Sequence, residues 1–235
     1  MRLLHRRVSE RKRAGVDLVP WISWCFVIGS ALFALGVPMS MVKAWPVWVS
    51  GTTFFVGSVF FTTAATLQLV GCVDEPLATG GRRAWVQVGR YEWWSDVSQW
   101  IGTLFFNVNT FRGAYSQGLS ATAADQLIWV PDAVGSALFL ISSVLACIAL
   151  RRTAGRVPAR DLEWRINAVN LAGSVLFGIA AVGAFVITET SSLYNARWAN
   201  VGTAAGAVCF LVAAWWLRAD DPGVADPASA TAATT

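Results

Sequence analysis

A stripe of polar residues inside an apolar run is the feature of this sequence that could most readily do chemistry. Its members are Asp96, Gln99, Thr103, Asn107 and Thr110, at spacings of 3, 4, 4 and 3 residues. At about 100° per residue, these side chains fall within about 80° of one another on one face of a helix. The stripe could hydrogen-bond to neighbouring helices, or it could line a hydrated path for a small solute.

The same template recurs in two later stretches of the chain. Each stretch has a polar residue six positions before a glycine, another three positions before it, and a small residue directly after it. The three sets are Asp96, Gln99 and Thr103 around Gly102; Asn167, Asn170 and Ser174 around Gly173; and Asn200, Thr203 and Ala207 around Gly206. We expect the three stripes to lie on equivalent faces of their helices.

Interhelical hydrogen bonding is the favoured interpretation of these stripes, at about 0.6 kcal/mol per contact and up to about 2. A proton- or sodium-coupled carrier usually has an ionisable group or a broken helix at mid-membrane depth. No Glu, Lys, Arg or His lies near the middle of any apolar run, and Asp96 and Asp132 lie close to run ends. A pathway for a small solute is kept as the alternative.

Motifs for catalysis, cofactor binding or metal binding are missing from the sequence. GxSxG, HExxH, GxxxxGK[ST] and GxGxxG do not occur. Cys25, Cys72, Cys147 and Cys209 lie in or at the ends of apolar runs without CxxC spacing, and His5 is the single histidine. We therefore expect no disulfide, no metal site, no cofactor and no enzyme activity.

Membrane-spanning helices are the elements that must position these residues. The 235-residue chain is 55% hydrophobic and 14% charged, against about 25% charged in a soluble domain, which argues against a water-soluble enzyme. A bilayer core of about 30 Å needs about 20 mostly apolar residues per helix. The predicted spans are Val19–Val42, Trp45–Val70, Val130–Leu150, Ile166–Ile187 and Trp198–Leu217, with the more polar Trp93–Phe111 as a sixth.

The distribution of basic residues orients these six spans. Lys and Arg favour the cytoplasmic side of short loops. With both termini inside, Lys43, Arg112 and Arg197 face outward and the other 15 of the 18 basic residues face the cytoplasm. The net charge of +4 therefore indicates orientation rather than a nucleic-acid partner.

The predicted fold is all-α, a polytopic membrane protein of three repeated helical hairpins with both termini cytoplasmic. The hairpins cover residues 19–70, 93–150 and 166–218; the segments outside them are a basic N-terminal segment 1–18, an interfacial loop 71–92, a basic loop 151–165 and a disordered tail 219–235. The basic N-terminal segment suits the anionic lipids of the inner leaflet. Other membrane proteins or a second copy of the chain are the remaining expected partners.

Every predicted span carries a glycine followed four residues later by phenylalanine. The glycines are Gly29, Gly57, Gly102, Gly135, Gly173 and Gly206, and the phenylalanines are Phe33, Phe61, Phe106, Phe139, Phe177 and Phe210. Lipid gives helices no hydrophobic reason to associate, so small residues must let backbones approach closely. We expect the glycines to form a packing seam whose notches are filled by phenylalanines of neighbouring helices.

These repeated helices, together with Gly102–Phe111 and Trp164–Ser174, resemble the YrhK-like family. The resemblance covers roughly residues 18–217 and is closest to the six-span membrane proteins with YrhK-like domains of actinobacteria. It implies a bacterial plasma membrane location and brings no established activity or catalytic residue. We predict a non-catalytic membrane protein that acts through helix packing or with partners, or alternatively a small-solute transporter or channel that uses the third-span stripe.

Overall fold

The computed structural model describes residues 12–13, 16–42, 45–74, 86–116, 118–155 and 161–219. The long helices are α2 (Val19–Met41), α3 (Val47–Asp74), α4 (Tyr91–Tyr115), α6 (Val130–Ala154), α7 (Leu162–Gly183) and α8 (Ala196–Ala219). The short elements are β1 (Lys12–Arg13), β2 (Val16–Asp17), α5 (Ala121–Ala124), η1 (Asp125–Trp129), β3 (Val186–Ile187) and β4 (Ser192–Leu193). Most of the basic N-terminal segment, most of the tail and parts of both predicted cytoplasmic loops lie outside the described residues.

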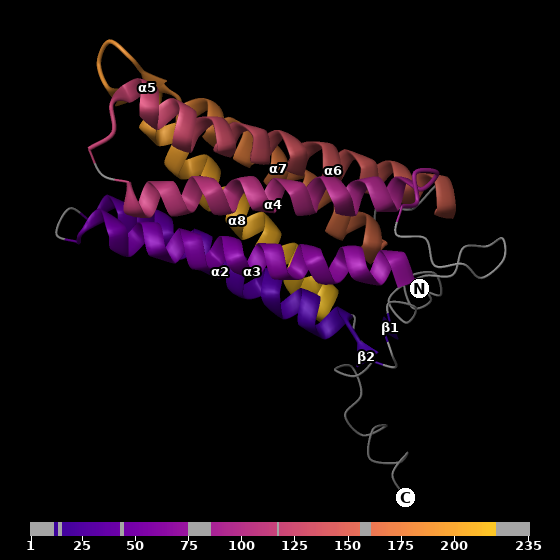
Figure 1. The fold of residues 1–235 in the computed structure, drawn as a ribbon. Coiled ribbons are helices and arrows are strands. Elements are labelled where there is room, and N and C mark those ends of the chain that lie inside the picture. Colours follow the sequence, from indigo (N-terminus) through magenta and orange to yellow (C-terminus); the bar gives the residue numbers. More distant parts are fainter. Residues whose placement is uncertain are drawn as a thin grey trace, which may run out of the picture.

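The six long helices form a closed ring. Each helix packs against the next one along the chain, and the last helix, α8, packs against the first, α2. Val19 at the start of α2 contacts Leu217 near the end of α8, so the ring closes between these two helices. Figure 1 shows the helices side by side along a common direction, with β1 and β2 at one end.

Five of these helices are long and apolar enough to cross a membrane, namely α2, α3, α6 with its N-terminal extension, α7 and α8. Large apolar side chains such as Leu35, Ile141 and Val201 are exposed on them. Exposed apolar side chains along whole helices suit a lipid environment and not water. The chain is therefore an all-α protein of the multi-pass membrane type. The sixth helix, α4, lies in the same ring but is more polar than these five.

The predicted span Ile166–Ile187 is too long at its C-terminal end. Helix α7 ends at Gly183, and Val186 and Ile187 form β3, which pairs antiparallel with β4. The Asn195 N–H donates to the Gly183 carbonyl at 2.9 Å, which satisfies a carbonyl left open by the helix end. The apolar run continues into β3 because β-branched residues suit a strand as well as a membrane helix.

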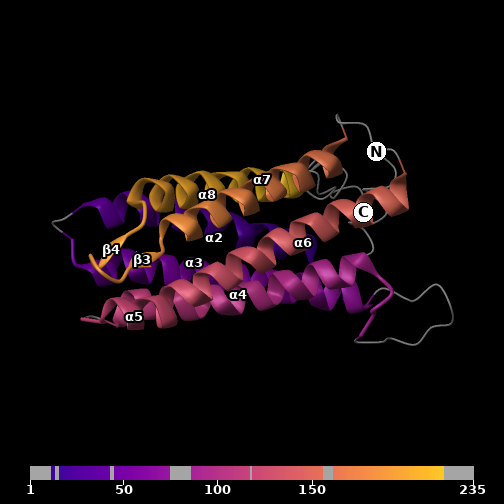
Figure 2. The same cartoon turned by 90° about the horizontal axis from the view of Figure 1, so that it is seen from above.

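The predicted span Val130–Leu150 begins too late, because the helical chain starts at Ala121 and continues without a break through α5 and η1. Ser120 caps this start by accepting from the Ala123 N–H at 3.2 Å. The segment Asp125–Trp129 is a π-helical turn, followed by Val130 and then by Pro131, which lacks a backbone N–H. Figure 2 shows α5, β3 and β4 together at one end of the ring.

Reciprocal packing of glycine against phenylalanine joins the two helices of each hairpin. In the first hairpin, a Cβ at Gly29 would lie 2.9 Å from the Gly57 carbonyl oxygen and 3.1 Å from the Phe61 ring. A Cβ at Gly57 would lie 2.8 Å from the Phe33 ring. The same exchange joins Gly102 and Phe106 to Gly135 and Phe139, and Gly173 and Phe177 to Gly206 and Phe210. The two backbones therefore touch where a larger residue would hold them apart.

The six motif phenylalanines meet inside the ring as one cluster, hereafter the phenylalanine cluster: Phe33, Phe61, Phe106, Phe139, Phe177 and Phe210. None of them is more than 7% exposed. Ring centroids lie 5.2 Å apart for Phe177 and Phe210, and 6.3 Å apart for Phe61 and Phe139. Most pairs meet edge to face, the arrangement that aromatic quadrupoles favour. The cluster fills the interior of the ring at this level.

Replacing Gly29 with alanine should lower the free energy of unfolding by about 1–3 kcal/mol, because the added Cβ would press on the Gly57 carbonyl oxygen. Gly178→Ala is the matched control, since a Cβ there meets no atom within 4 Å. Reversible unfolding in mixed micelles measures both variants. Equal losses in the two would contradict close packing at Gly29.

Candidate functional site

A cavity of about 220 Å³ lies between the helices at the end of the ring where α2 begins and α8 ends. All six long helices contribute to its lining. Phe26, Phe139 and Phe210 line it too, and the last two belong to the phenylalanine cluster, which therefore forms its inner end. A water molecule occupies about 30 Å³ of liquid, so the cavity has room for about seven waters or one small organic solute.

The cavity has a polar wall and an apolar wall. Helices α4, α6 and α7, which are neighbours in the ring, provide most of the polar wall: Glu92, Ser95, Asp96, Gln99, Ser142, Ser143, Glu163, Asn167 and Asn170. Helices α8 and α2, also neighbours, provide the apolar wall: Val19, Ile22, Phe26, Phe210, Ala213, Ala214 and Leu217. A ligand in this space would meet hydrogen-bonding groups on one side and hydrocarbon on the other.

The first half of the predicted stripe on α4 faces this cavity. Asp96 is only 6% exposed, and both Asp96 and Gln99 line the space. The Gln99 side-chain oxygen accepts from the Ser142 hydroxyl of α6 at 3.4 Å. Asn167 and Asn170 line the same cavity from α7. The structure thus brings together the polar residues at equivalent positions of α4 and α7.

The second half of the stripe packs against α3. The Asn107 side-chain N–H donates to the Thr62 hydroxyl at 2.8 Å, and the Thr110 and Ser58 hydroxyls lie 3.0 Å apart. Thr103, at the level of Gly102, is fully buried and donates to the carbonyl of its own helix at Trp100. Asn107 and Thr110 therefore join α4 to α3, and none of the three residues lines the cavity.

The polar residues of α8 do not join those of α4 and α7 at the cavity, because they lie at the other end of the ring; that the three stripes lie on equivalent faces of their helices stays a prediction. Helix α8 contributes Ala213 and Leu217 to the cavity, whereas Asn200 lies 13 residues before Ala213, about 20 Å along the helix. Thr203 donates to the Ala199 carbonyl of its own helix. The α8 stripe is at the other end because α8 is the second helix of its hairpin and runs in the opposite direction.

Ser174, the remaining residue of the α7 stripe, lies just past the cavity and is fully buried. Its hydroxyl lies 2.8 Å from that of Ser143 on α6. Asp132, at the other end of α6, accepts from the Asn109 side chain of α4 at 2.7 Å. Short polar contacts therefore link α6 to both of its neighbours in the ring.

Glu92 and Glu163 line the cavity but were not predicted from the sequence. Their position in the repeat is nevertheless a pattern from which they could have been predicted. Each lies ten positions before its motif glycine. The repeated polar pattern therefore includes this position as well as the positions six and three residues before the glycine. Val19 occupies the same position before Gly29 in α2 and also lines the cavity. The first helices of the three hairpins thus present equivalent positions to one space.

Gln68 was also missed, because it lies in α3 outside any stripe. Its side-chain oxygen is buried and has no hydrogen-bond partner among the described residues. Gln68 lies eleven positions after Gly57, and the equivalent residues of the other two hairpins, Ala146 and Leu217, line the cavity too. The cavity therefore holds a buried acceptor that a ligand could satisfy.

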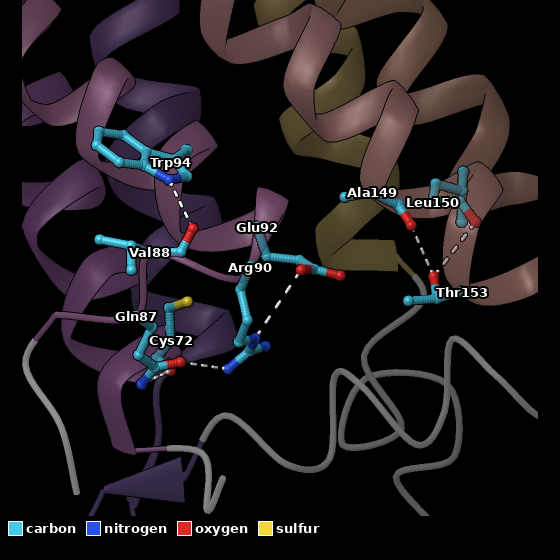
Figure 3. Close-up of polar contacts among 9 residues, drawn as sticks. All are labelled: Cys72, Gln87, Val88, Arg90, Glu92, Trp94, Ala149, Leu150 and Thr153. Atoms are coloured by element: carbon cyan, nitrogen blue, oxygen red, sulfur yellow. Dashed lines mark hydrogen bonds and ion pairs between the residues drawn. The ribbon is translucent and has the colours of Figure 1, made fainter. Parts of the chain in front are cut away.

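Hydrogen bonds tie the chain before α4 to the end of α3 and position Glu92. Figure 3 shows Arg90 between Gln87 and Glu92, with an N–H donated to the Gln87 side-chain oxygen at 2.7 Å and its Nε 3.9 Å from the Glu92 carboxylate. The Gln87 amide donates to the Cys72 carbonyl at 3.5 Å. Trp94 donates to the Val88 carbonyl at 3.0 Å.

Arginines stack on aromatic rings around the end of the ring that holds the cavity. The pairs are Arg151 with Trp164, Arg152 with Tyr91, Arg165 with Trp216 and Arg218 with Trp24, at 4.4–5.1 Å from guanidinium carbon to ring centroid. We call these eight residues the arginine–aromatic girdle. Such pairs suit the interface between lipid and water, where indole rings and cations both settle.

A metal centre finds no support in the part of the chain that the structure describes, where no group of three His, Cys, Asp or Glu is placed to hold an ion. The cysteines Cys25, Cys72, Cys147 and Cys209 are free thiols.

Comparison with known proteins gives no match to a family model, to a curated protein or to a solved structure. The resemblance to the YrhK-like family is therefore without support from these comparisons, and the site has to be interpreted from its own geometry.

Asn107→Leu and Thr62→Val should each weaken the contact between α4 and α3, with a coupling of about 0.6–1.7 kcal/mol in the unfolding free energy. The double-mutant cycle in mixed micelles isolates this pair from other effects of the substitutions. Zero coupling would show that the second half of the stripe does not act through this hydrogen bond.

Proposed function

We propose that the chain is a non-catalytic, six-span protein of the bacterial plasma membrane that binds a small polar solute from the cytoplasmic side. The observation that carries this proposal is the polar cavity at one end of the ring, with the phenylalanine cluster at its inner end. Polar side chains within a membrane protein are costly to bury, and ionisable ones among them are the default candidates for a functional site.

The proposal counts α4 as the sixth span. Its polar residues Asp96, Thr103 and Thr110 are turned inward and buried, whereas its exposed positions include the apolar Leu104, Val108 and Phe111. A mean hydropathy averages the buried polar face of α4 with its exposed apolar face and so underestimates how apolar the exposed face is. The surface that α4 offers to lipid is therefore as suitable as that of its neighbours α3 and α6.

The arginine–aromatic girdle supports a cytoplasmic position for the cavity end. Arg151, Arg152, Arg165 and Arg218 all belong to it. Positive charge near span ends favours the cytoplasmic side. With this orientation, both the start of α2 and the end of α8 face the cytoplasm.

The phenylalanine cluster favours solute binding over an open channel. A channel along the α4 stripe would pass Thr103, which is fully buried, and then Asn107, which is engaged by Thr62. Transport of a bound solute would therefore need the cluster to rearrange. A purely structural role, in which every stripe residue only joins helices, is the competing proposal. It accounts for the second half of the stripe, whereas in the first half Gln99 both contacts Ser142 of α6 and lines the cavity.

Cysteine substitution tests the proposal directly. In inside-out membrane vesicles, Gln99→Cys should react with a membrane-impermeant thiol reagent at least about tenfold faster than Thr103→Cys or Asn107→Cys, because thiol reactivity follows exposure. The unsubstituted chain gives the background from its four native cysteines.

Three outcomes of this experiment are distinguishable. Reaction at Gln99→Cys alone is the expected result. Protection at all three positions would favour the purely structural role, and reaction at all three would favour a continuous path through the membrane.

A further inference from the structure

The arginine–aromatic girdle follows the outside of the ring from helix to helix. Each of its four contacts joins two neighbouring helices, namely α4 with α6, α6 with α7, α7 with α8 and α8 with α2. Helix α7 extends Arg165 to α8 and receives Arg151 of α6 on Trp164. Helix α8 extends Arg218 to α2 and receives Arg165 on Trp216. The girdle is therefore an arc of cations, each of which lies where two helices meet.

The N–H edges of these guanidinium groups are open. Each group has one face covered by an aromatic ring, at 4.4–5.1 Å from its central carbon to the ring centroid. In the part of the chain that the structure describes, none of the four arginines forms an ion pair or donates a side-chain hydrogen bond. Arg151, Arg152 and Arg165 are exposed. A guanidinium has five N–H donors in a planar fork, which fits two oxygens of one phosphate.

Carboxylates close to the girdle in sequence have other contacts. Glu92, Asp96 and Glu163 line the cavity inside the ring. Asp161 caps α7, where it accepts from the backbone N–H groups of Glu163 and Trp164. The described chain therefore leaves the positive charge of the girdle open to an anion from outside the protein.

Helix dipoles account for only part of the girdle. Arg151 and Arg152 lie in the last turn of α6, and Arg218 lies in the last turn of α8. A cation is favourable at these positions because the C-terminus of a helix is its negative end. Arg165 lies near the start of α7, at the positive end, where the dipole disfavours a cation. An external anion would stabilise all four arginines alike.

Exposed indole rings at the same end of the ring indicate that this anion carries hydrocarbon. Trp24, Trp94 and Trp215 are 41%, 43% and 55% exposed, and they belong to α2, α4 and α8. Exposed indoles settle at the boundary between lipid headgroups and acyl chains, which places the guanidinium groups at the depth of the phosphates. A soluble anion would gain nothing from these rings, whereas the acyl chain of a lipid would cover them.

We infer that anionic phospholipids bind along the arginine–aromatic girdle, with their phosphates on the guanidinium edges and their acyl chains beside the exposed indoles. Because each contact of the girdle joins two helices, a bound lipid would also stabilise the closed ring. The inference takes the cytoplasmic leaflet, where anionic lipids are found, from the orientation in the proposed function. Binding itself does not depend on the cavity.

Thermal unfolding of the full chain in micelles of a neutral detergent tests the inference. The probes are dioleoyl phosphatidylglycerol and dioleoyl phosphatidylcholine, which share their acyl chains and differ in net charge. A ligand of the folded state raises the Tm as its sites fill. Phosphatidylglycerol should reach the same rise in Tm at about tenfold lower concentration than phosphatidylcholine. Inorganic phosphate at equal concentration should leave the Tm unchanged, because it lacks acyl chains.

Substitutions locate the binding to the girdle. Arg165→Gln and Arg218→Gln should each raise the phosphatidylglycerol concentration needed by about fivefold, the effect of one cation beside an anionic membrane surface. Arg165→Lys keeps the charge without the planar fork and should restore only part of this loss. Arg197→Gln is the matched control, because Arg197 is exposed at the start of α8, at the other end of the ring. The Tm of each variant in phosphatidylcholine serves as its own baseline, so a less stable variant remains informative.

Four results would overturn the inference. They are equal effects of the two lipids, an equal effect of inorganic phosphate, an unchanged preference for phosphatidylglycerol in both Arg165→Gln and Arg218→Gln, and a loss in Arg197→Gln as large as in these variants. Full recovery in Arg165→Lys would replace phosphate binding by the guanidinium edges with unspecific attraction and would overturn it as well.

Failure of this inference is distinguishable from failure of the proposed function. The reactivity of Gln99→Cys depends on the cavity and not on lipid charge. If the preference for phosphatidylglycerol is absent while Gln99→Cys reacts, only the lipid sites are disproved. If Gln99→Cys is protected while the preference is present, the girdle binds lipid in a protein whose cavity is closed to water.

Discussion

At the centre of each hairpin, the carbonyl oxygen of one glycine lies 2.9–3.2 Å from the position that a Cβ on the other would take, and this close contact sets the distance between the two helices. For Gly29 and the Gly57 oxygen the separation would be 2.9 Å, and for Gly102 and the Gly135 oxygen 3.2 Å. Because the backbones are this close, each phenylalanine one turn further on covers the opposite glycine and projects into the ring. Three such hairpins bring six aromatic rings to one level, and the cavity begins where those rings end.

The level of a polar residue relative to the phenylalanine cluster decides its role. On α4, Asp96 and Gln99 lie beyond the cluster and line the cavity, whereas Asn107 lies on the other side of it and bonds to α3. The two alternatives for the stripe, packing and passage, are therefore not exclusive. Each describes one half of the same helix. An antiparallel helix with the same sequence template, α8, places its polar residues at the other end for the same reason.

Hydropathy and the spacing of glycine and phenylalanine were enough to locate the long helices and the residues at their contacts, because both patterns depend on local sequence. The hairpin of β3 and β4 could not be found this way, since Val186 and Ile187 are apolar and only their hydrogen bonding distinguishes them from helix. The cavity could not be found either. It depends on which helices run in the same direction and which are neighbours. Glu92 and Glu163 can therefore be assigned to one cavity only from the structure, in which α4 and α7 line the same wall.

The closed ring is the central claim, because a ring that opened between α2 and α8 would have neither an enclosed phenylalanine cluster nor an apolar cavity wall. Disulfide cross-linking of the pair Val19→Cys and Leu217→Cys in native membranes tests it most directly, since these two side chains are in contact. The pair Val19→Cys and Tyr115→Cys is the control, because Tyr115 ends α4 at the other end of the ring. The ring predicts rapid cross-linking of the first pair and none of the second. Failure of the first pair, or equal cross-linking of both, would contradict it.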